Sequence, residues 1–372
     1  MTGQLDEKDF ESAEFRKFLD LCVNCKACSL ECPSGVDVSK LITTARAEYV
    51  KRRGLRRAEL ALSHNRYLSM LGSIFAPVSN FVMGLGVFKW FLEKVVGLDR
   101  RRGMPSFARR SFLRAGRKYL AACKPIAAPI DKVAYFVDTY ANYNDHELGF
   151  AVVEVLRANG IDVILPKQRP APLPAIVYGN VKRAQRDLAY SVKHLAKAVR
   201  DGYKIICSEP SAALCLKQEL RHFVAGEDAE LVSENTYELM SYLWDLYKRG
   251  RLKNPQVNLG AKYADGFVYH LPCHLFAIGG EGASIELLNK LCSVSVVDLG
   301  AGCCGLAGTF GMQQKNYELS SQIAARLKEA LEKESCKYVL TECAACKMQM
   351  EHISDAMVVH PIKIIAEAYK DR

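Results

Sequence analysis

The chain has 372 residues and a mass of 41.4 kDa, which predicts two or three domains and excludes a single small module. With 49% hydrophobic and 25% charged residues, it has the composition of a soluble globular protein, which excludes wholesale disorder, a collagenous repeat and a transporter with many spans. The formal net charge of +10 favours an anionic partner surface, whether lipid, nucleic acid or acidic protein.

The cysteine content is the most informative feature of the composition. The chain contains 14 cysteines, and its first residues, Met1-Thr2-Gly3-Gln4, do not read as a secretory signal. We therefore expect a reducing, cytoplasmic compartment, in which the cysteines ligate metal instead of forming a disulfide framework.

A dense cysteine run stands near the start of the chain. It reads Cys22-Val-Asn-Cys25-Lys-Ala-Cys28-Ser-Leu-Glu-Cys32-Pro33, which is the spacing of bacterial ferredoxins. Such short spacings let thiolates wrap one four-iron cube, and this crowding favours iron and sulfide over zinc, which is the alternative. In two-cluster ferredoxins the last cysteine of the run serves the other cluster. The fourth ligand is therefore either Cys32 or a remote thiolate such as Cys123.

An uncharged segment follows over 67–88 and reads YLSMLGSIFAPVSNFVMGLGVF. Its 22 residues are long enough for a membrane span, but a proline, an asparagine, three glycines and three serines lower its apolarity. Residues 100–118 then carry eight Lys or Arg and no acidic residue. Apolar surface framed by cations fits a segment that lies on an anionic leaflet, and a helical hairpin packed inside the protein is the alternative.

Residues 132–372 alternate short β-branched or aromatic runs with amphipathic helices, which predicts an α/β fold. Helices are predicted over 146–158, where Asp145 is the cap, and from Pro210 to Phe223. Six strands are predicted, over 133–137, 162–165, 204–207, 267–271, 295–299 and 338–340.

These strands fall into two sets, and a shift of 133 residues superposes one set on the other, which predicts an internal duplication. We expect the second copy to hold metal and the first copy to hold none, because the cysteines fall in the second. The shift aligns Cys273 with Tyr140, Cys303 and Cys304 with Pro170 and Ala171, and Cys343 and Cys346 with Pro210 and Ala213.

Five cysteines of the second copy follow three successive predicted strands. They are Cys273, Cys303, Cys304, Cys343 and Cys346. Because the carboxyl ends of neighbouring strands converge in an open α/β sheet, we expect all five to meet in one crevice. Vicinal cysteines cannot easily serve one zinc ion, whereas a multi-iron cluster can take five thiolates. The Cys343-Ala-Ala-Cys346 segment should open a helix, whose dipole lowers thiolate pKa values.

The neighbouring residues are given lesser roles. His270 and His274 flank Cys273 and are interpreted as residues that tune the metal site. The glycines from Gly305 to Gly311 do not form a convincing dinucleotide loop. Buried packing positions are predicted for Cys207, Cys215, Cys292 and Cys336.

At these residues the chain resembles proteins with the cysteine-rich CCG domain. They include the B subunit of heterodisulfide reductase, the C subunit of anaerobic glycerol-3-phosphate dehydrogenase, the glycolate oxidase iron–sulfur subunit and the iron–sulfur half of FAD-linked D-lactate dehydrogenases. The likeness runs from about residue 12 and also covers Ser34–Asp37, Phe136–Tyr140, Ser208–Ser211 and Gly302–Gly305. It implies two tandem, duplicated CCG-type α/β domains behind a mainly helical, ferredoxin-like 4Fe-4S region.

The resemblance also implies the domain bounds and the cofactors. We expect a ferredoxin-like region at 1–50, a helical connecting region at 51–130, a first CCG-like domain without cysteines at 131–255 and a cluster-binding CCG domain at 256–372. In heterodisulfide reductase, five cysteines in this arrangement hold a noncubane 4Fe-4S cluster, which the resemblance carries onto the five cysteines from Cys273 to Cys346. Relatives usually have two ferredoxin motifs, so the electron path here is either shorter or completed by a further iron–sulfur subunit.

The expected function is that of an iron–sulfur electron-transfer subunit in an FAD-dependent dehydrogenase complex. The donor would be glycerol 3-phosphate or a 2-hydroxy acid such as D-lactate or glycolate, and the acceptor quinone or another carrier. Hydride chemistry would belong to the FAD-containing partner, because no flavin fold or substrate base is visible in the sequence. No catalytic residue is assigned.

Two rival functions stay open. One is a disulfide or heterodisulfide reductase in which the five-cysteine cluster cleaves S–S bonds, and the other is a zinc-stabilised assembly subunit. Nucleic-acid binding is not expected, because no reading motif accompanies the basic charge. The expected location is cytoplasmic, either free or peripheral on the inner face of the cell membrane.

Overall fold

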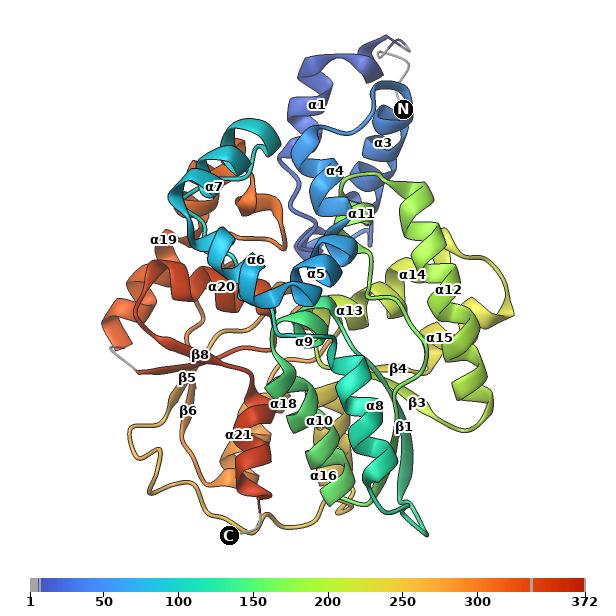
Figure 1. The fold of residues 1–372 in the computed structure, drawn as a ribbon, viewed down its shortest axis with the longest axis vertical. Helices are drawn as coiled ribbons and strands as arrows, with labels where there is room; N and C mark the ends of the chain where they lie inside the picture. Colours follow the sequence, from blue (N-terminus) through green and yellow to red (C-terminus); the bar gives the residue numbers. More distant parts are fainter. Residues whose placement is uncertain (1–5, 7, 335–336, 371–372) are drawn as a thin grey trace.

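A computed structural model describes residues 6, 8–334 and 337–370, so Cys336 lies outside the described residues. Its N-terminal helices stand above two β-sheets that are each flanked by helices (Figure 1). The first of these helices are η1 (Asp9–Glu11), α1 (Ala13–Asp20), α2 (Ala27–Glu31), α3 (Val38–Arg53) and α4 (Arg57–Ser63). Short polar side chains begin two of them: Ser12 Oγ accepts from Phe15 N at 3.1 Å, and Asp37 Oδ1 accepts from Lys40 N at 3.0 Å.

The uncharged segment 67–88 forms several short helices. They are α5 (Asn65–Ile74), α6 (Ala76–Gly84) and α7 (Gly86–Phe91), followed by the π-helix η2 (Leu92–Val96) and by α8 (Phe112–Ala122). Among the described residues, no single helix has the length and apolarity needed to cross a membrane. Taken together, α5 and α6 are long and apolar enough, but the chain bends by 110° between them. The bend falls where Pro77 occupies the first turn of α6, a position that suits proline.

One side of α5 and α6 packs inward and the other is exposed. Inside, Ser73 is 1% exposed and donates to the carbonyls of Ala108 and Arg110, while Asn80 Nδ2 donates to Phe107 O at 2.9 Å. Outside, large apolar side chains face solvent: Leu71, Ile74, Phe75, Val78, Phe81, Val87 and Trp90. The segment therefore combines the packed hairpin and the exposed apolar surface that the sequence presented as alternatives.

The first sheet is parallel and has the order β2-β1-β3-β4. Its strands are β1 (Asp131–Phe136), β2 (Ile161–Ile164), β3 (Lys204–Cys207) and β4 (Thr236–Glu238). Its helices are α9 (Thr139–Tyr143), α10 (His146–Ala158), α11 (Leu173–Val177), α12 (Val181–Arg200), α13 (Pro210–Leu214), η3 (Cys215–Glu219), α14 (Leu220–Phe223), α15 (Glu227–Glu234) and α16 (Leu239–Lys248). We call residues 131–248 the first lobe.

The second sheet is also parallel and has the order β6-β5-β7-β8. Its strands are β5 (Phe267–Tyr269), β6 (Val296–Asp298), β7 (Tyr338–Leu340) and β8 (Met357–Val359). Its helices are α17 (Cys273–Ala277), α18 (Ala283–Leu287), η4 (Leu288–Cys292), η5 (Phe310–Met312), η6 (Gln314–Asn316), α19 (Tyr317–Glu334), α20 (Ala344–Ile353) and α21 (Pro361–Ala368). We call residues 267–368 the second lobe.

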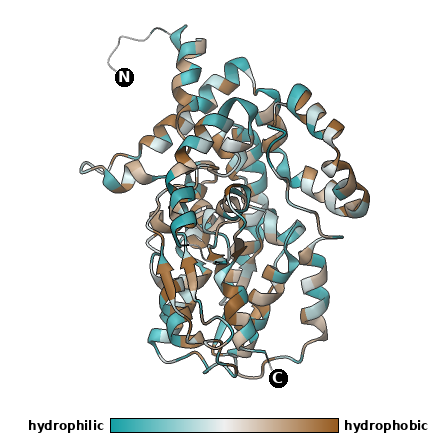
Figure 2. Cartoon of the chain, turned by 90° about the vertical axis from the view of Figure 1, so that its left-hand side faces the viewer, coloured by the Kyte–Doolittle hydropathy of each residue, from teal (hydrophilic) through white to brown (hydrophobic). Residues whose placement is uncertain are grey.

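One of the hydrophobic clusters spans both lobes. The helix after the last strand of each lobe packs on the other lobe, since α16 contacts α18 and α21 contacts α10. Buried residues of both sheets, including Tyr135 and Tyr269, belong to the same cluster. Figure 2 shows the strands as hydrophobic segments, as expected for parallel sheets covered on both faces.

The predicted α/β class is confirmed, and all six predicted strands are present to within one or two residues at each end. The predicted helix at 146–158 is α10, and the one from Pro210 to Phe223 is interrupted by the π-helix η3. The edge strands β4 and β8 were not predicted, because each is short and runs into a helix within two residues, so its pattern does not stand apart from that of the helix. Cys207, Cys215 and Cys292 are fully buried, as predicted.

Candidate metal centre

The second sheet brings five cysteines to one edge. The chain leaves β5 toward Cys273, β6 toward Cys303 and Cys304, and β7 toward Cys343 and Cys346. All five line the same cavity, which has a volume of about 330 Å³. The strand-end convergence predicted from sequence is therefore seen in the structure.

The thiols influence one another inside the cavity. Interactions with Cys303 and Cys346 hold the pKa of Cys304 well below its ordinary value, whereas burial raises the pKa of Cys273. The pKa values of Cys343 and Cys346 lie above their ordinary value, so the lowering expected from the helix dipole is not seen at these two cysteines.

An imidazole joins this sulfur group. The ligand atoms of His270, Cys304 and Cys346 lie within 4.8 Å of one another, and all three residues are buried. In the described part of the chain, no other set of three His, Cys, Asp or Glu residues is this compact. His270, which the sequence placed beside the site, therefore lies close enough to Cys304 and Cys346 for the three residues to surround one metal ion.

Backbone geometry shapes the loop that carries Cys303 and Cys304. Gly305 has φ +82°, and a Cβ there would lie 2.3 Å from the carbonyl oxygen of Ser320, so this close approach requires glycine. The Gly305 amide donates to Cys303 Sγ at 3.4 Å. Cys343 is the N-cap of α20, as predicted, which directs the amide end of that helix toward the sulfurs.

The N-terminal cysteine run forms a loop and one short helix. Cys22 and Cys25 lie in the loop before α2, Cys28 lies within α2 and Cys32 ends it; all four are partly exposed. Amides that follow the helix, first that of Val36, hydrogen-bond to Cys32 and lower its pKa. Amide donors of this kind are those that stabilise thiolates bound to iron–sulfur clusters.

A buried arginine holds this loop against the rest of the protein. Arg46 of α3 is 3% exposed and donates to the carbonyls of Leu19 and Cys22, the latter at 2.6 Å. Its other nitrogen donates to Val177 O of α11 at 3.0 Å. The loop is therefore tied to the first lobe. Cys123 instead ends α8, which packs against α10 and β2.

The N-terminal run lies beside the five-cysteine cavity. His274, next to Cys273, bonds to Asn24 O through Nε2 at 2.8 Å and to Ser211 Oγ through Nδ1 at 2.9 Å. The helix α2 packs against α17, and Cys25 is close enough to Cys273 to raise its pKa electrostatically. The two cysteine groups, distant in sequence, are neighbours in the fold.

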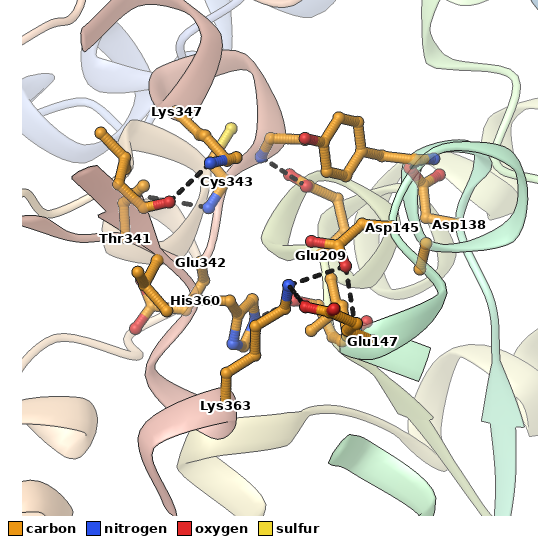
Figure 3. Close-up of a pocket in the computed structure, with 17 residues that line it drawn as sticks. Asp138, Asp145, Glu147, Glu209, Thr341, Glu342, Cys343, Lys347, His360 and Lys363 are labelled. Carbon is orange, nitrogen blue, oxygen red and sulfur yellow. Dashed lines mark hydrogen bonds and ion pairs between the residues drawn. The ribbon is translucent and has the colours of Figure 1, made fainter. Parts of the chain in front are cut away.

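A second cavity, of about 180 Å³, shares part of its lining with the first. Figure 3 shows the residues that line this second cavity. It is lined by residues that follow strands of both lobes, among them Asp138, Glu209 and His360. Burial raises the pKa of Glu209 to about 8 and lowers the pKa of His360 to about 4. Five residues line both cavities: Asp138, Tyr140, Glu209, Cys343 and Ala344.

Several site residues were not found from sequence. Glu209 accepts from Ala344 N at 2.9 Å and so caps the helix that carries Cys346, although it comes from the first lobe. The sequence gives this residue no role at the second-lobe cysteines. Asn24 lines the larger cavity and is 1% exposed. A single polar residue between two cysteines gives no sequence signal for such a position.

Comparison with known proteins agrees with this geometry. A family model described as CCG, cysteine-rich domain, matches residues 267–351, which contain all five cysteines. The C subunit of anaerobic glycerol-3-phosphate dehydrogenase from Escherichia coli K12 is 30% identical over 338 residues, or 90% of this chain and 83% of that protein. D-2-hydroxyglutarate dehydrogenase of Pantoea ananatis is 22% identical over 381 residues, 97% of this chain but 35% of that protein. Lactate utilization protein A of Bacillus pumilus is 26% identical over 227 residues, which are 59% of this chain and 90% of that protein.

The fold and the sulfur-lined cavity define an iron–sulfur protein with a cysteine-rich CCG domain. The identity and coverage go further: the chain belongs to the family of the C subunit of anaerobic glycerol-3-phosphate dehydrogenase. The resemblance inferred from the cysteine motifs is thereby confirmed.

Proposed function

We propose that the chain is the iron–sulfur electron-transfer subunit of a dehydrogenase complex whose separate FAD-containing subunit oxidises glycerol 3-phosphate or a 2-hydroxy acid. One observation carries the proposal: five cysteines from three strand ends line one cavity. The names of the relatives support the donor class, since they are a glycerol-3-phosphate dehydrogenase subunit, a hydroxy-acid dehydrogenase and a lactate utilization protein.

The second metal site would be held by the five cysteines of this cavity. A zinc ion takes four ligands, whereas the cavity offers five thiols and the His270 imidazole. An iron–sulfur cluster supplies one-electron steps. The surrounding residues fit such a group, because Gly305 N already donates to a cysteine sulfur and α20 presents its amide end. A noncubane four-iron cluster is the form we propose.

The first metal site would be a four-iron cube on Cys22, Cys25, Cys28 and Cys32. The amide donors on Cys32 favour it as the fourth ligand, and Cys123 lies on a different element, α8. The contact between His274 and the Asn24 carbonyl supports a short distance between the two proposed sites. Electrons would enter at one site and leave at the other within this one chain.

The domain organisation is part of the same proposal. We assign residues 1–50 to the ferredoxin-like region, 51–130 to the connecting region, and 131–255 and 256–372 to the two duplicated domains. The identical strand order supports the duplication. At a shift of 133 residues, the register pairs Tyr135–Ile206 and Phe136–Cys207 coincide with Val268–Val339 and Tyr269–Leu340.

The apolar outer side of α5 to α7 would hold the complex against the cytoplasmic face of a membrane. A run of basic residues over 100–118 follows in the sequence; Arg102 of this run is buried against the second lobe, and Arg100, Arg109, Arg110 and Arg114 are exposed. Amphipathic surfaces of this composition bind anionic lipid in the plane of the interface. Quinone or another carrier would then accept the electrons, and a further iron–sulfur subunit would complete the path if this chain holds only one end of it.

Metal analysis after anaerobic purification tests the central claim. We expect about eight irons and eight sulfides per chain if each site holds four irons, with no stoichiometric zinc. The purified chain should bind an FAD-containing dehydrogenase and be reduced by it when the donor is added. About four irons with one zinc would make the second site structural. A thiol-bound cluster radical during disulfide turnover would instead assign the chain to the reductases.

A further inference from the structure

The cavity that the five cysteines line extends well beyond them. Its walls also come from α4, α5 and α6, from the 98–107 segment and from α11. The side chains at this end are mostly apolar, although Asn65 and Ser69 of α5 also line it; the apolar ones include Leu62, Leu68, Met83, Met104, Phe107 and Val177. A cluster bonded to cysteines accounts for the sulfur end of the cavity, but aliphatic and aromatic walls offer it no ligand. The apolar end therefore has space and surface suited to an organic molecule.

One polar side chain in this lining has no partner. Asn24 is 1% exposed, and within the described residues neither its Oδ1 nor its Nδ2 has a hydrogen-bond partner. Leaving both ends of a buried amide unpaired is costly, whereas a ligand with a carbonyl or hydroxyl group would offset that cost. The Asn24 backbone has φ +56°, and its carbonyl oxygen lies 2.8 Å from Nε2 of His274, so the residue stands beside Cys273.

The charge of the lining restricts the ligand further. Two carboxyl groups, Asp138 and Glu209, face the cavity, and no Lys or Arg among the described residues lines it. Phosphates and carboxylates are ordinarily recognised by Arg or Lys, so this lining disfavours an anionic ligand. The ligand that fits is neutral, largely apolar and equipped with a hydrogen-bonding oxygen.

The helices that line the apolar end also form the exposed apolar surface. Leu68 of α5 both lines the cavity and is 52% exposed, which places it at the mouth. On the same helices, Ile74, Val78 and Phe81 are each more than half exposed. A ligand that dissolves in lipid would thus meet the mouth of the cavity where the protein presents its apolar side chains.

We propose that the apolar end of this cavity binds a lipophilic quinone, with a ring oxygen hydrogen-bonded to Asn24, beside the five-cysteine site. The inference rests on the proposed electron-transfer function and adds a location to it. The quinone would take two electrons, one at a time, from the cysteine site, which the partner's reduced flavin replenishes. Two protons from water complete the conversion of each quinone to its quinol.

Binding of decylubiquinone to the iron-loaded chain, measured by equilibrium dialysis in detergent, tests the proposal. We expect saturable binding at one site. Asn24→Leu, which removes the amide at similar volume, should weaken it about tenfold, as expected for one lost hydrogen bond to a buried group. Leu68→Trp should close the mouth and weaken it more. Leu60→Trp is the matched control, because Leu60 lies on α4, is 49% exposed and does not line the cavity.

Iron content and the electron paramagnetic resonance spectrum of each variant separate this proposal from the proposed function. Variants that keep wild-type iron and spectra but bind quinone less tightly support the quinone site. Unchanged affinity in both Asn24→Leu and Leu68→Trp, or displacement of the quinone by a small disulfide substrate, would overturn it while leaving electron transfer intact. A chain that takes up no iron–sulfur cluster would instead refute the proposed function.

Discussion

The two lobes have the same sheet but differ at the strand ends. Each sheet is parallel, with four strands in the same spatial order. The second lobe carries five cysteines after its strands, whereas the aligned residues of the first lobe include Tyr140, Ala171 and Pro210. The strands of the first lobe are buried and apolar although none of these cysteines follows them, so the two sheets share the same apolar packing and differ in the residues at their strand ends.

Aligned glutamates show what the first lobe does instead. Glu342 of the second lobe accepts hydrogen bonds from Tyr269 and Ser284, within its own lobe. Glu209 of the first lobe reaches across to the amide of Ala344 at the start of α20. The first lobe therefore supports the cysteine loops of the second and walls the shared cavity, although it has no cysteine ligands of its own.

Of the changes considered, removal of one proposed ligand in the second lobe should have the largest effect on iron content and on the rate of electron transfer. In Cys304→Ser we expect iron to fall by about half and electron transfer to drop by at least about a hundredfold, since even residues behind metal ligands commonly contribute ten- to a hundredfold. Cys215→Ser is the control, because Cys215 is fully buried in the first-lobe core. Iron analysis and stopped-flow reduction measure both variants. Equal iron content in the two variants would contradict the ligand assignment.

Removal of a ligand from the N-terminal site should have an effect almost as large. A comparison of two variants also identifies the fourth ligand of that site. Cys32→Ser should remove the signal of the four-iron cube, because the thiolate that the neighbouring amides stabilise is lost. Cys123→Ser should leave that signal unchanged, since Cys123 ends α8 beside the first lobe. The low-temperature spectrum of the reduced protein is the measurement. The opposite pattern would make Cys123 the ligand and leave Cys32 free to serve elsewhere.

Features that depend on spacing along the chain were predictable from the sequence. The strand ends, the five cysteines and the cysteine run follow local patterns, and so does the helix opened by Cys343. Features that arise from packing between distant segments were not. The cross-lobe bond of Glu209 joins residues 135 positions apart, and the unpaired amide of Asn24 is defined only by what surrounds it. The packing of α16 and α21 on the opposite lobe was likewise not predictable, because hydrophobic periodicity shows that a helix has a buried face but not which element covers it.

A buried histidine at the junction of the lobes should make stability depend on pH. His360 is 6% exposed; Nε2 bonds to Ser208 O of the first lobe at 2.9 Å and Nδ1 accepts from Ile362 N at 3.1 Å. Burial lowers its pKa from 6.5 to about 4, so the folded state favours the neutral ring. The stability from this group is fully present above pH 6.5 and is lost as pH falls toward 4.

Urea unfolding between pH 7.5 and pH 4.5 measures this effect. The contribution of His360 should decrease by about 2.5 kcal/mol over that range, because most of the interval between the two pKa values is crossed. His360→Asn should be less stable at pH 7.5 but show a shallower pH dependence. His194→Asn, on α12 of the first lobe, should keep the full dependence. A His360→Asn curve parallel to the wild type would show that other groups carry the pH effect.

The smallest expected effect concerns the ion pair that also joins the lobes. Lys363 of α21 contacts Asp145 at 2.7 Å and Glu147 at 3.4 Å, and its side chain is 23% exposed. Because solvent screens a pair of this exposure, Lys363→Met should cost no more than about 1 kcal/mol of unfolding free energy, and the cost should shrink in high salt. Lys328→Met is the matched control, since Lys328 and Glu332 are more than half exposed within α19. A much larger, salt-insensitive loss would mean that polar contacts, and not the apolar packing of α16 and α21, hold the lobes together.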